Sequence, residues 1–306
     1  MKKLFNLLLL TTFALGCFGQ SDLLYSHFMF NKLAFNPGYT GSKGAFDVSA
    51  FYRRQWSGID GSPRTMNFNA HTPFGSGRNA MGLSFTADEI GDVKSTAFDL
   101  FYAYQIKWSS KSKLSIGLQG RIEQARLRWS NASAAERDDL AIPSTDDTNY
   151  APNFGVGAYY FAGKYYVGLS VPRLLKNPLY LSNDNTGTSR EGVLTYYMTA
   201  GAQFKLARQI QLMPAVLLSY NTNAPVDIDL NANFLFLDAF WLGASYRLAD
   251  SFDGLVGYEF KNGMRLGLAM DFTLSKLRKF TNGSYEMMLG YTFKCKECDV
   301  HHLRYF

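Results

Sequence analysis

The residues whose types and spacing best suit chemistry lie close to the carboxyl end, where Cys295-x-x-Cys298 is followed by His301-His302. Two thiols and two imidazoles are ligand types that Zn²⁺ accepts. The spacing matches no zinc-finger pattern and all four groups stand on one short segment, so we expect no metal site. The alternatives are a local disulfide between Cys295 and Cys298 in an oxidising compartment, or free thiols. No thioredoxin-like pattern surrounds the pair, which disfavours a redox role.

Acidic side chains gather in a second candidate region, between residues 127 and 150. Carboxylates suit Ca²⁺, but no Asp-x-Asp-x-Asp-Gly pattern is present, and a solvated acidic loop is expected. His71 stands on the polar phase of its segment and could act as the base of a hydrolase. The sequence has no Gly-x-Ser-x-Gly motif to supply the serine nucleophile. We therefore expect neither enzyme activity, nor a cofactor, nor a bound metal.

The beginning of the chain reads as a secretory signal. Lys2 and Lys3 precede an apolar run that gives way to small residues, and we place cleavage after Gly19. Three cysteines in 306 residues exclude a disulfide scaffold, and no later stretch approaches the roughly 20 apolar residues of a spanning helix. The balance of 31 basic and 25 acidic residues, without long basic runs, does not favour nucleic acid as a partner.

Most of the remaining chain alternates apolar and polar residues with a period of two, which is typical of β-strands. In the segment 264–274 the even positions are apolar throughout, whereas the odd positions include Arg265 and Asp271. Such segments run nearer ten residues than the five or six of an ordinary soluble strand. Aromatic residues on the apolar phase, such as Trp108 and Tyr285, stand towards segment ends, where headgroup zones would lie.

Fourteen segments of this kind are expected to be strands. They lie near 45–56, 65–73, 79–87, 94–108, 112–126, 151–161, 164–172, 191–206, 209–220, 226–236, 239–248, 252–260, 263–275 and 284–294. Connections after even-numbered strands are short, and every long connection follows an odd-numbered strand. Bacterial outer-membrane barrels have this asymmetry, with short periplasmic turns and long outer loops. The sequence thus predicts an all-β fold, a single transmembrane antiparallel up-and-down β-barrel in the outer-membrane lipid, with both termini in the periplasm.

The stretch before the first strand is too apolar for a free tail. We expect residues 20–44 to form a plug or cap, 45–294 the barrel, and 295–306 a periplasmic tail. Within the plug we predict a short helix and then a turn at Asn36-Pro37-Gly38, with Phe28, Phe30 and Phe35 packed inside the barrel. The inward phase of the first strand holds Phe51, Arg53 and Gln55, and Arg53 is expected to donate to backbone carbonyls of the plug.

Several motifs resemble the PorP/SprF family of outer-membrane proteins, whose N-terminal pattern is YMFN followed by NPAYAG. The matching residues run in the family's order along almost the whole mature chain: Phe28-Met29-Phe30-Asn31, Asn36-Pro37-Gly38-Tyr39-Thr40-Gly41, Arg53-Arg54-Gln55-Trp56-Ser57-Gly58, Gly61-Ser62-Pro63-Arg64-Thr65, Pro152-Asn153-Phe154-Gly155 and Arg304-Tyr305-Phe306. Gly38 and Thr40 replace the usual alanines, and Leu303 replaces a proline before the final Arg-Tyr-Phe.

The resemblance implies a component of the type IX secretion system of Bacteroidota, which exports proteins with a C-terminal sorting domain. Members serve the machine generally or support the export or attachment of one surface protein, including adhesins of gliding motility. We expect a secreted protein or another secretion component as partner. Candidate plug and partner residues are Phe28, Phe30, Phe35, Asn36, Pro37, Gly38, Tyr39, Gly41, Arg53, Gln55, Trp56, Pro63, Trp129, Tyr150 and Tyr180.

A passive porin is the alternative. Inward charges such as Arg121, Asp229 and Arg265 could line a water-filled constriction. The apolar N-terminal segment disfavours this interpretation, because placing it inside the barrel would obstruct conduction.

Overall fold

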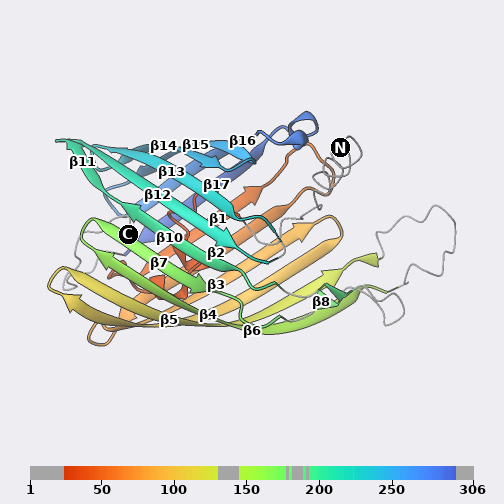
Figure 1. The fold of residues 1–306 in the computed structure, drawn as a ribbon, viewed down its shortest axis with the longest axis horizontal. Helices are drawn as coiled ribbons and strands as arrows, with labels where there is room; N and C mark the ends of the chain where they lie inside the picture. The colour runs from red at the N-terminus through yellow and green to blue at the C-terminus, as the bar shows by residue number, and fades with distance from the viewer. Residues whose placement is uncertain are drawn as a thin grey trace, which may run out of the picture.

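The computed structural model describes residues 24–129, 145–176, 179–180, 189–190, 193–222 and 224–293. These residues form a closed antiparallel β-barrel (Figure 1). The strands are β1 (Asp47–Arg54), β2 (Arg64–Phe74), β3 (Asn79–Ile90), β4 (Val93–Ser109), β5 (Ser112–Leu127), β6 (Asp147–Ala162), β7 (Tyr165–Val171), β8 (Leu179–Tyr180), β9 (Ser189–Arg190), β10 (Tyr196–Ala202), β11 (Phe204–Ala207), β12 (Ile210–Tyr220), β13 (Asp227–Phe236), β14 (Phe240–Arg247), β15 (Ser251–Glu259), β16 (Met264–Thr273) and β17 (Ser284–Thr292).

Successive strands pair around the wall, and β1 pairs with β17 to join the first strand to the last. β10 and β11 share one position, interrupted at Gln203, so the 15 strands of the sheet make 14 barrel strands. β8 and β9 form a separate small hairpin. The predicted fold and its fourteen strands are confirmed, with the segment 191–206 corresponding to β10 and β11. Within the described ranges, no helix is long and apolar enough to cross a membrane.

The period of two in the sequence becomes the two faces of the wall. On β16, Leu268 and Phe272 point outward and are 53% and 51% exposed, whereas Arg265 and Asp271 point inward and are 4% and 1% exposed. A band of apolar side chains on the outside of a closed barrel faces lipid, and this placement accounts for their exposure.

The strands differ in length, which makes one side of the wall taller than the other. β4, β5 and β6 have 17, 16 and 16 residues, but β1 and β14 have 8 each. The long strands reach beyond the rest of the barrel toward the end that carries β8 (Figure 1). We call this the long-loop end, and the opposite end, with the tight hairpins, the short-turn end.

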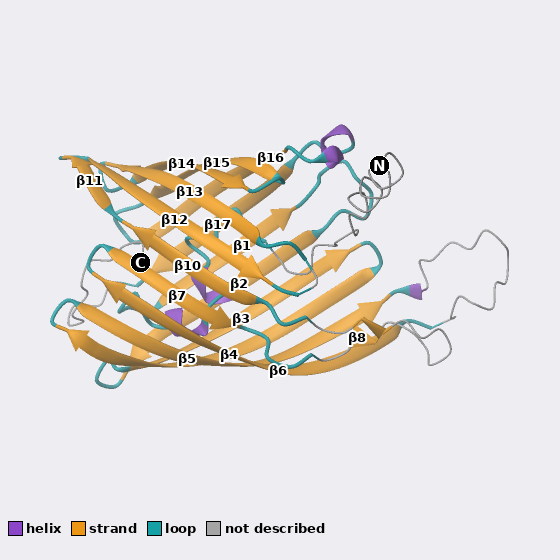
Figure 2. Ribbon diagram, in the orientation of Figure 1, coloured by secondary structure: helices purple, strands orange, loops and turns teal. Residues whose placement is uncertain are grey.

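The stretch before β1 lies within the barrel and contains the 3₁₀ helices η1 (Lys32–Ala34) and η2 (Pro37–Tyr39) (Figure 2). Another 3₁₀ helix, η4 (Lys276–Lys279), lies between β16 and β17. The short helix predicted before the Asn36-Pro37-Gly38 turn is present as η1, a 3₁₀ helix of three residues, and turns precede it. The predicted signal and the C-terminal tail lie outside the described residues.

Candidate functional site

The candidate site is the interior of the barrel and the segment that fills it, residues 24–46, which we call the plug segment. At one end of this segment Ser26 contacts β16 and β17 close to their long-loop ends. At its other end the backbone N–H of Gly41 donates to His71 Nδ1 at 3.1 Å, and Lys43 Nζ lies 2.9 Å from Asp47 Oδ2, near the short turns. The plug segment therefore runs the length of the lumen, antiparallel to β1.

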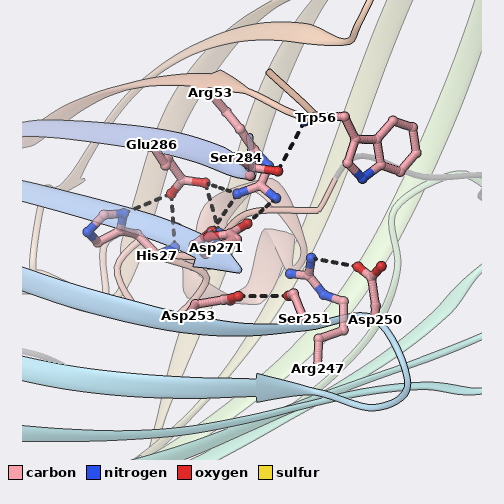
Figure 3. A network of polar contacts seen from close by, with 12 residues as sticks. His27, Arg53, Trp56, Arg247, Asp250, Ser251, Asp253, Asp271, Ser284 and Glu286 are labelled. Atoms are coloured by element: carbon pink, nitrogen blue, oxygen red, sulfur yellow. Dashed lines mark hydrogen bonds and ion pairs between the residues drawn. The ribbon is translucent and has the colours of Figure 1, made fainter. Parts of the chain in front are cut away.

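A buried polar network binds the start of the plug segment (Figure 3). The Glu286 carboxylate accepts from the backbone N–H groups of Ser26 at 2.8 Å and His27 at 2.9 Å, and His27 Nδ1 lies 2.8 Å from it. Arg53 Nη2 lies 2.6 Å from Asp271 Oδ2, and its Nη1 lies 3.2 Å from Glu286 and donates to the Ser26 hydroxyl. The charges of the two carboxylates are thus met by a guanidinium and by plug donors, as burial requires.

This network corrects one expectation. Arg53 was predicted to donate to backbone carbonyls of the plug, but its partners are a hydroxyl and two carboxylates. Asp271 and Glu286, which pair with Arg53, compete better for a guanidinium than a neutral carbonyl does, because a charge-assisted hydrogen bond is stronger.

An apolar part of the lumen wall packs against the aromatic residues of the plug segment. Phe28 and Phe35 are both 2% exposed. The Phe30 ring lies 5.2 Å from the Trp241 ring, and the Phe35 ring lies 5.4 Å from the Tyr197 ring, between centroids. The same cluster includes the inward residues Met213, Leu217, Leu235, Leu255 and Met288. The aromatic side chains of the plug segment thus lie in an apolar cluster that reaches onto β1, β16 and β17, next to the polar network.

The Asn36-Pro37-Gly38 turn sits against strands that lack side chains at the point of contact. The Asn36 side chain accepts from the backbone N–H of Gly38 at 2.8 Å and donates to the backbone carbonyl of Ala158 at 3.0 Å. A Cβ atom on Gly117 would overlap Pro37, and one on Gly157 would overlap Asn36. The turn therefore fixes the plug segment to the inner face of β5 and β6.

The next residues of the motif complete this anchor. The Tyr39 ring makes edge-on contacts with Tyr159 and His71, each at 5.4 Å between centroids. Gly41 has φ +70°, a conformation that favours glycine, and a side chain there would overlap Ala80. Lys32 is also buried, with its ammonium 4.1 Å from the centre of the Tyr166 ring.

Other candidates lie at the long-loop rim, where two loops are joined. The backbone N–H of Gln55 donates to the Pro63 carbonyl at 2.9 Å, and that of Trp56 donates to Ser284 Oγ at 3.2 Å. Ser57 exchanges backbone hydrogen bonds with the loop before β17, donating to Gly283 at 2.8 Å and accepting from Asn282 at 2.7 Å. These contacts hold loop 55–63 against loop 274–283.

The remaining partner candidates are separate from the plug segment. Trp129 Nε1 donates to Asp147 Oδ2 at 2.9 Å on the tall wall, and Tyr150 is 61% exposed while its hydroxyl accepts from Gln124 at 2.9 Å. The backbone of Tyr180 lies in β8, and its side chain, like Cys295 and Cys298, is outside the described part. The structure thus divides the candidates into an interior set and a long-loop set.

Sequence reasoning missed Ser26, His27, Asp271 and Glu286 as plug contacts. Asp271 and Glu286 alternate with apolar neighbours, so their inward direction was readable, but their partners were not. No group of three metal-ligating side chains gathers among the described residues.

The two ends of the described chain lie toward opposite mouths. Ser26 lies near the long-loop end, whereas the backbone N–H of Phe293 donates to the Phe46 carbonyl at 2.9 Å at the short-turn end. The chain termini themselves lie outside the described residues, so their expected location in the periplasm stays a prediction.

Comparison with known proteins concerns the whole barrel. A family model described as "Type IX secretion system membrane protein PorP/SprF" matches residues 17–291. Similar solved structures include the CymD monoaromatic hydrocarbon channel, with a TM-score of 0.50 and 11% sequence identity over 90% of this chain and 94% of that chain. Another is the Ralstonia pickettii toluene transporter TbuX, with a TM-score of 0.49 and 11% sequence identity over 92% of this chain and 96% of that chain. At these identities the likeness concerns the fold alone. No curated protein matches the chain.

Proposed function

The chain belongs to the PorP/SprF family of type IX secretion system membrane proteins, and on that premise we propose that it binds a secreted or surface-anchored protein, or another secretion component, and supports its export or attachment. Neither the family description nor the barrel fold is that of an enzyme. The observation that carries the proposal is the filled lumen: Phe28, Phe35 and Tyr39 of the plug segment are at most 3% exposed. A barrel occupied in this way acts through its surfaces.

The binding surface in this proposal is the tall wall of β4, β5 and β6 at the long-loop end. It carries Trp129, the exposed Tyr150, and the arginines Arg126 and Arg128. Aromatic residues and arginine are the types that contribute most at protein interfaces. In the proposed orientation the long-loop end faces the cell exterior and the short-turn end, with Phe293, faces the periplasm.

The test is surface display of proteins that carry the C-terminal sorting domain. We expect the Trp129→Ala/Tyr150→Ala variant, and separately a deletion of residues 131–144, to reduce display while the barrel remains inserted, because loop length costs little stability. Trp108→Ala is the matched control, since Trp108 is an exposed aromatic residue near the short-turn end. Undiminished display in both long-loop variants would remove this surface from the function.

A passive porin remains the second candidate from the sequence, and no specific feature of the described lumen favours it. The plug segment makes both a buried polar network and an apolar cluster with the wall of this interior. Single-channel conductance of the intact protein in planar bilayers separates the two functions, because a porin conducts steadily and a plugged barrel does not.

A further inference from the structure

Two arginines lie side by side on the outside of the barrel at its long-loop end. Arg54 of β1 and Arg64 of β2 are direct cross-strand neighbours. They share the outward phase of Tyr52 and Met66, which are 37% and 57% exposed on the lipid-facing wall. Directly opposed residues of an antiparallel pair have Cβ atoms about 5 Å apart, and like charges in that position repel.

No carboxylate forms an ion pair with either arginine among the described residues. Glu89 is the other cross-strand neighbour of Arg64, but its carboxylate lies 2.7 Å from Arg128 and 3.6 Å from Lys94. The other neighbour of Arg54 is Tyr285. Arg54 Nε is buried without a hydrogen-bond partner. Within the described ranges, the guanidinium donors of this pair therefore have no anion from the chain as an ion-pair partner.

The adjoining loop has the composition of a segment at a membrane interface. Loop 274–283 leads into β17, the strand beside β1, and is joined to Ser57 by backbone hydrogen bonds. Its exposed residues include three cations, Lys276, Arg278 and Lys279, and three apolar side chains, Leu274, Leu277 and Phe280, with Phe280 72% exposed. Basic residues next to apolar ones mark contact with anionic headgroups.

We propose that Arg54 and Arg64 bind a phosphate group of a phosphorylated glycolipid of the lipid A type, with the cations of loop 274–283 beside it. The planar guanidinium presents two parallel donors that match phosphate oxygens. The acyl chains then run along Tyr52 and Met66. The lipid-facing position of these two residues favours a lipid over a protein as the source of the anion, and the choice of glycolipid rests on the orientation proposed above.

The probe is purified monophosphoryl lipid A, added to the full mature protein in detergent and followed by native mass spectrometry. We expect bound lipid A on the wild-type protein, and about tenfold weaker retention of the same lipid after its phosphate is removed. Arg54→Gln/Arg64→Gln should lose retention to a similar extent. Arg78→Gln/Arg208→Gln removes two exposed arginines at the short-turn end and should retain lipid A as the wild type does.

The comparison of phosphorylated with dephosphorylated lipid uses the unaltered protein, so it holds even if a variant folds poorly. Equal retention of the two lipids would overturn the proposal. So would equal losses in both arginine pairs, with circular dichroism showing intact barrels. Displacement of lipid A by an equimolar amount of phosphatidylglycerol would overturn the assignment to a glycolipid.

Discussion

Pro37 of the plug segment rests directly on Gly117 of β5, where the strand has no side chain. A methyl group at position 117 would overlap the carbonyl group of Pro37 and the amide nitrogen of Gly38. The strand therefore leaves room for the turn at this one level of the wall, and the position of the plug segment depends on an absent side chain.

We expect Gly117→Ala to lower the free energy of unfolding by about 1–3 kcal/mol, because backbone atoms of the plug segment must move to admit the methyl group. Urea unfolding in detergent micelles measures this loss. Gly120→Ala is the control on the same strand, since a Cβ there meets no heavy atom within 4 Å. Equal stability of the two variants would contradict the seating of Pro37.

Replacing Arg53 should have a larger effect. Arg53→Met leaves the carboxylates of Asp271 and Glu286 buried at 1% exposure each without their guanidinium, which should cost about 3–5 kcal/mol. Arg126→Met removes an ion pair of 2.8 Å in which the Arg126 side chain is 55% exposed, and should cost at most about 1 kcal/mol. The same urea titration compares them, and similar losses would refute a buried ionic anchor.

Removing residues 21–35 should open the lumen. The deletion takes away Phe28 and Phe35 and the contacts of Ser26 with Glu286, so water and ions gain a path. Planar-bilayer recordings should show a conducting state that the intact protein lacks. Deletion of residues 131–144 is the control and should leave conductance unchanged; a truncated barrel that stays closed would place the seal elsewhere.

Orientation can be measured by cysteine labelling of intact cells. In a background with Cys295→Ser and Cys298→Ser, a membrane-impermeant maleimide should label Lys279→Cys and not Lys111→Cys. Lys279 is exposed at the long-loop end, and Lys111 is exposed in the turn between β4 and β5. The reverse pattern would invert the proposed topology.

The strands could be predicted from the sequence because residues that face lipid must be apolar, which gives each strand a regular alternation. In β13, Leu230 and Phe234 are 51% and 39% exposed while Asp229 and Asn233 are buried, as alternation predicts. Residue types on the inward face are harder to predict, because an inward residue can be polar or apolar depending on what it contacts inside the lumen. Trp241 and Leu255 point inward because Phe28 and its neighbours form an apolar cluster with them.

The conformation of the plug segment was harder to predict for a related reason. Asn36 is fixed by backbone carbonyls of β6 and β7, and Ser26 by carboxylates more than 240 residues away in sequence. These partners override the local preference for a helix. A single sequence shows that Asp271 and Glu286 face inward, but not that they meet at Ser26.

The site that holds Ser26 and His27 has a consequence for the order in which the molecule is built. Its residues come from β1, β16 and β17, and β1 and β17 form the seam between the two ends of the sheet. The site is complete only when β1 has paired with β17. The plug segment must already lie inside the curved sheet when that pairing forms. Sealing of the lumen and closure of the seam are thus one assembly step. Without β17 the chain lacks Glu286 and cannot pair with β1, so the lumen is sealed only in a barrel that contains its last strand.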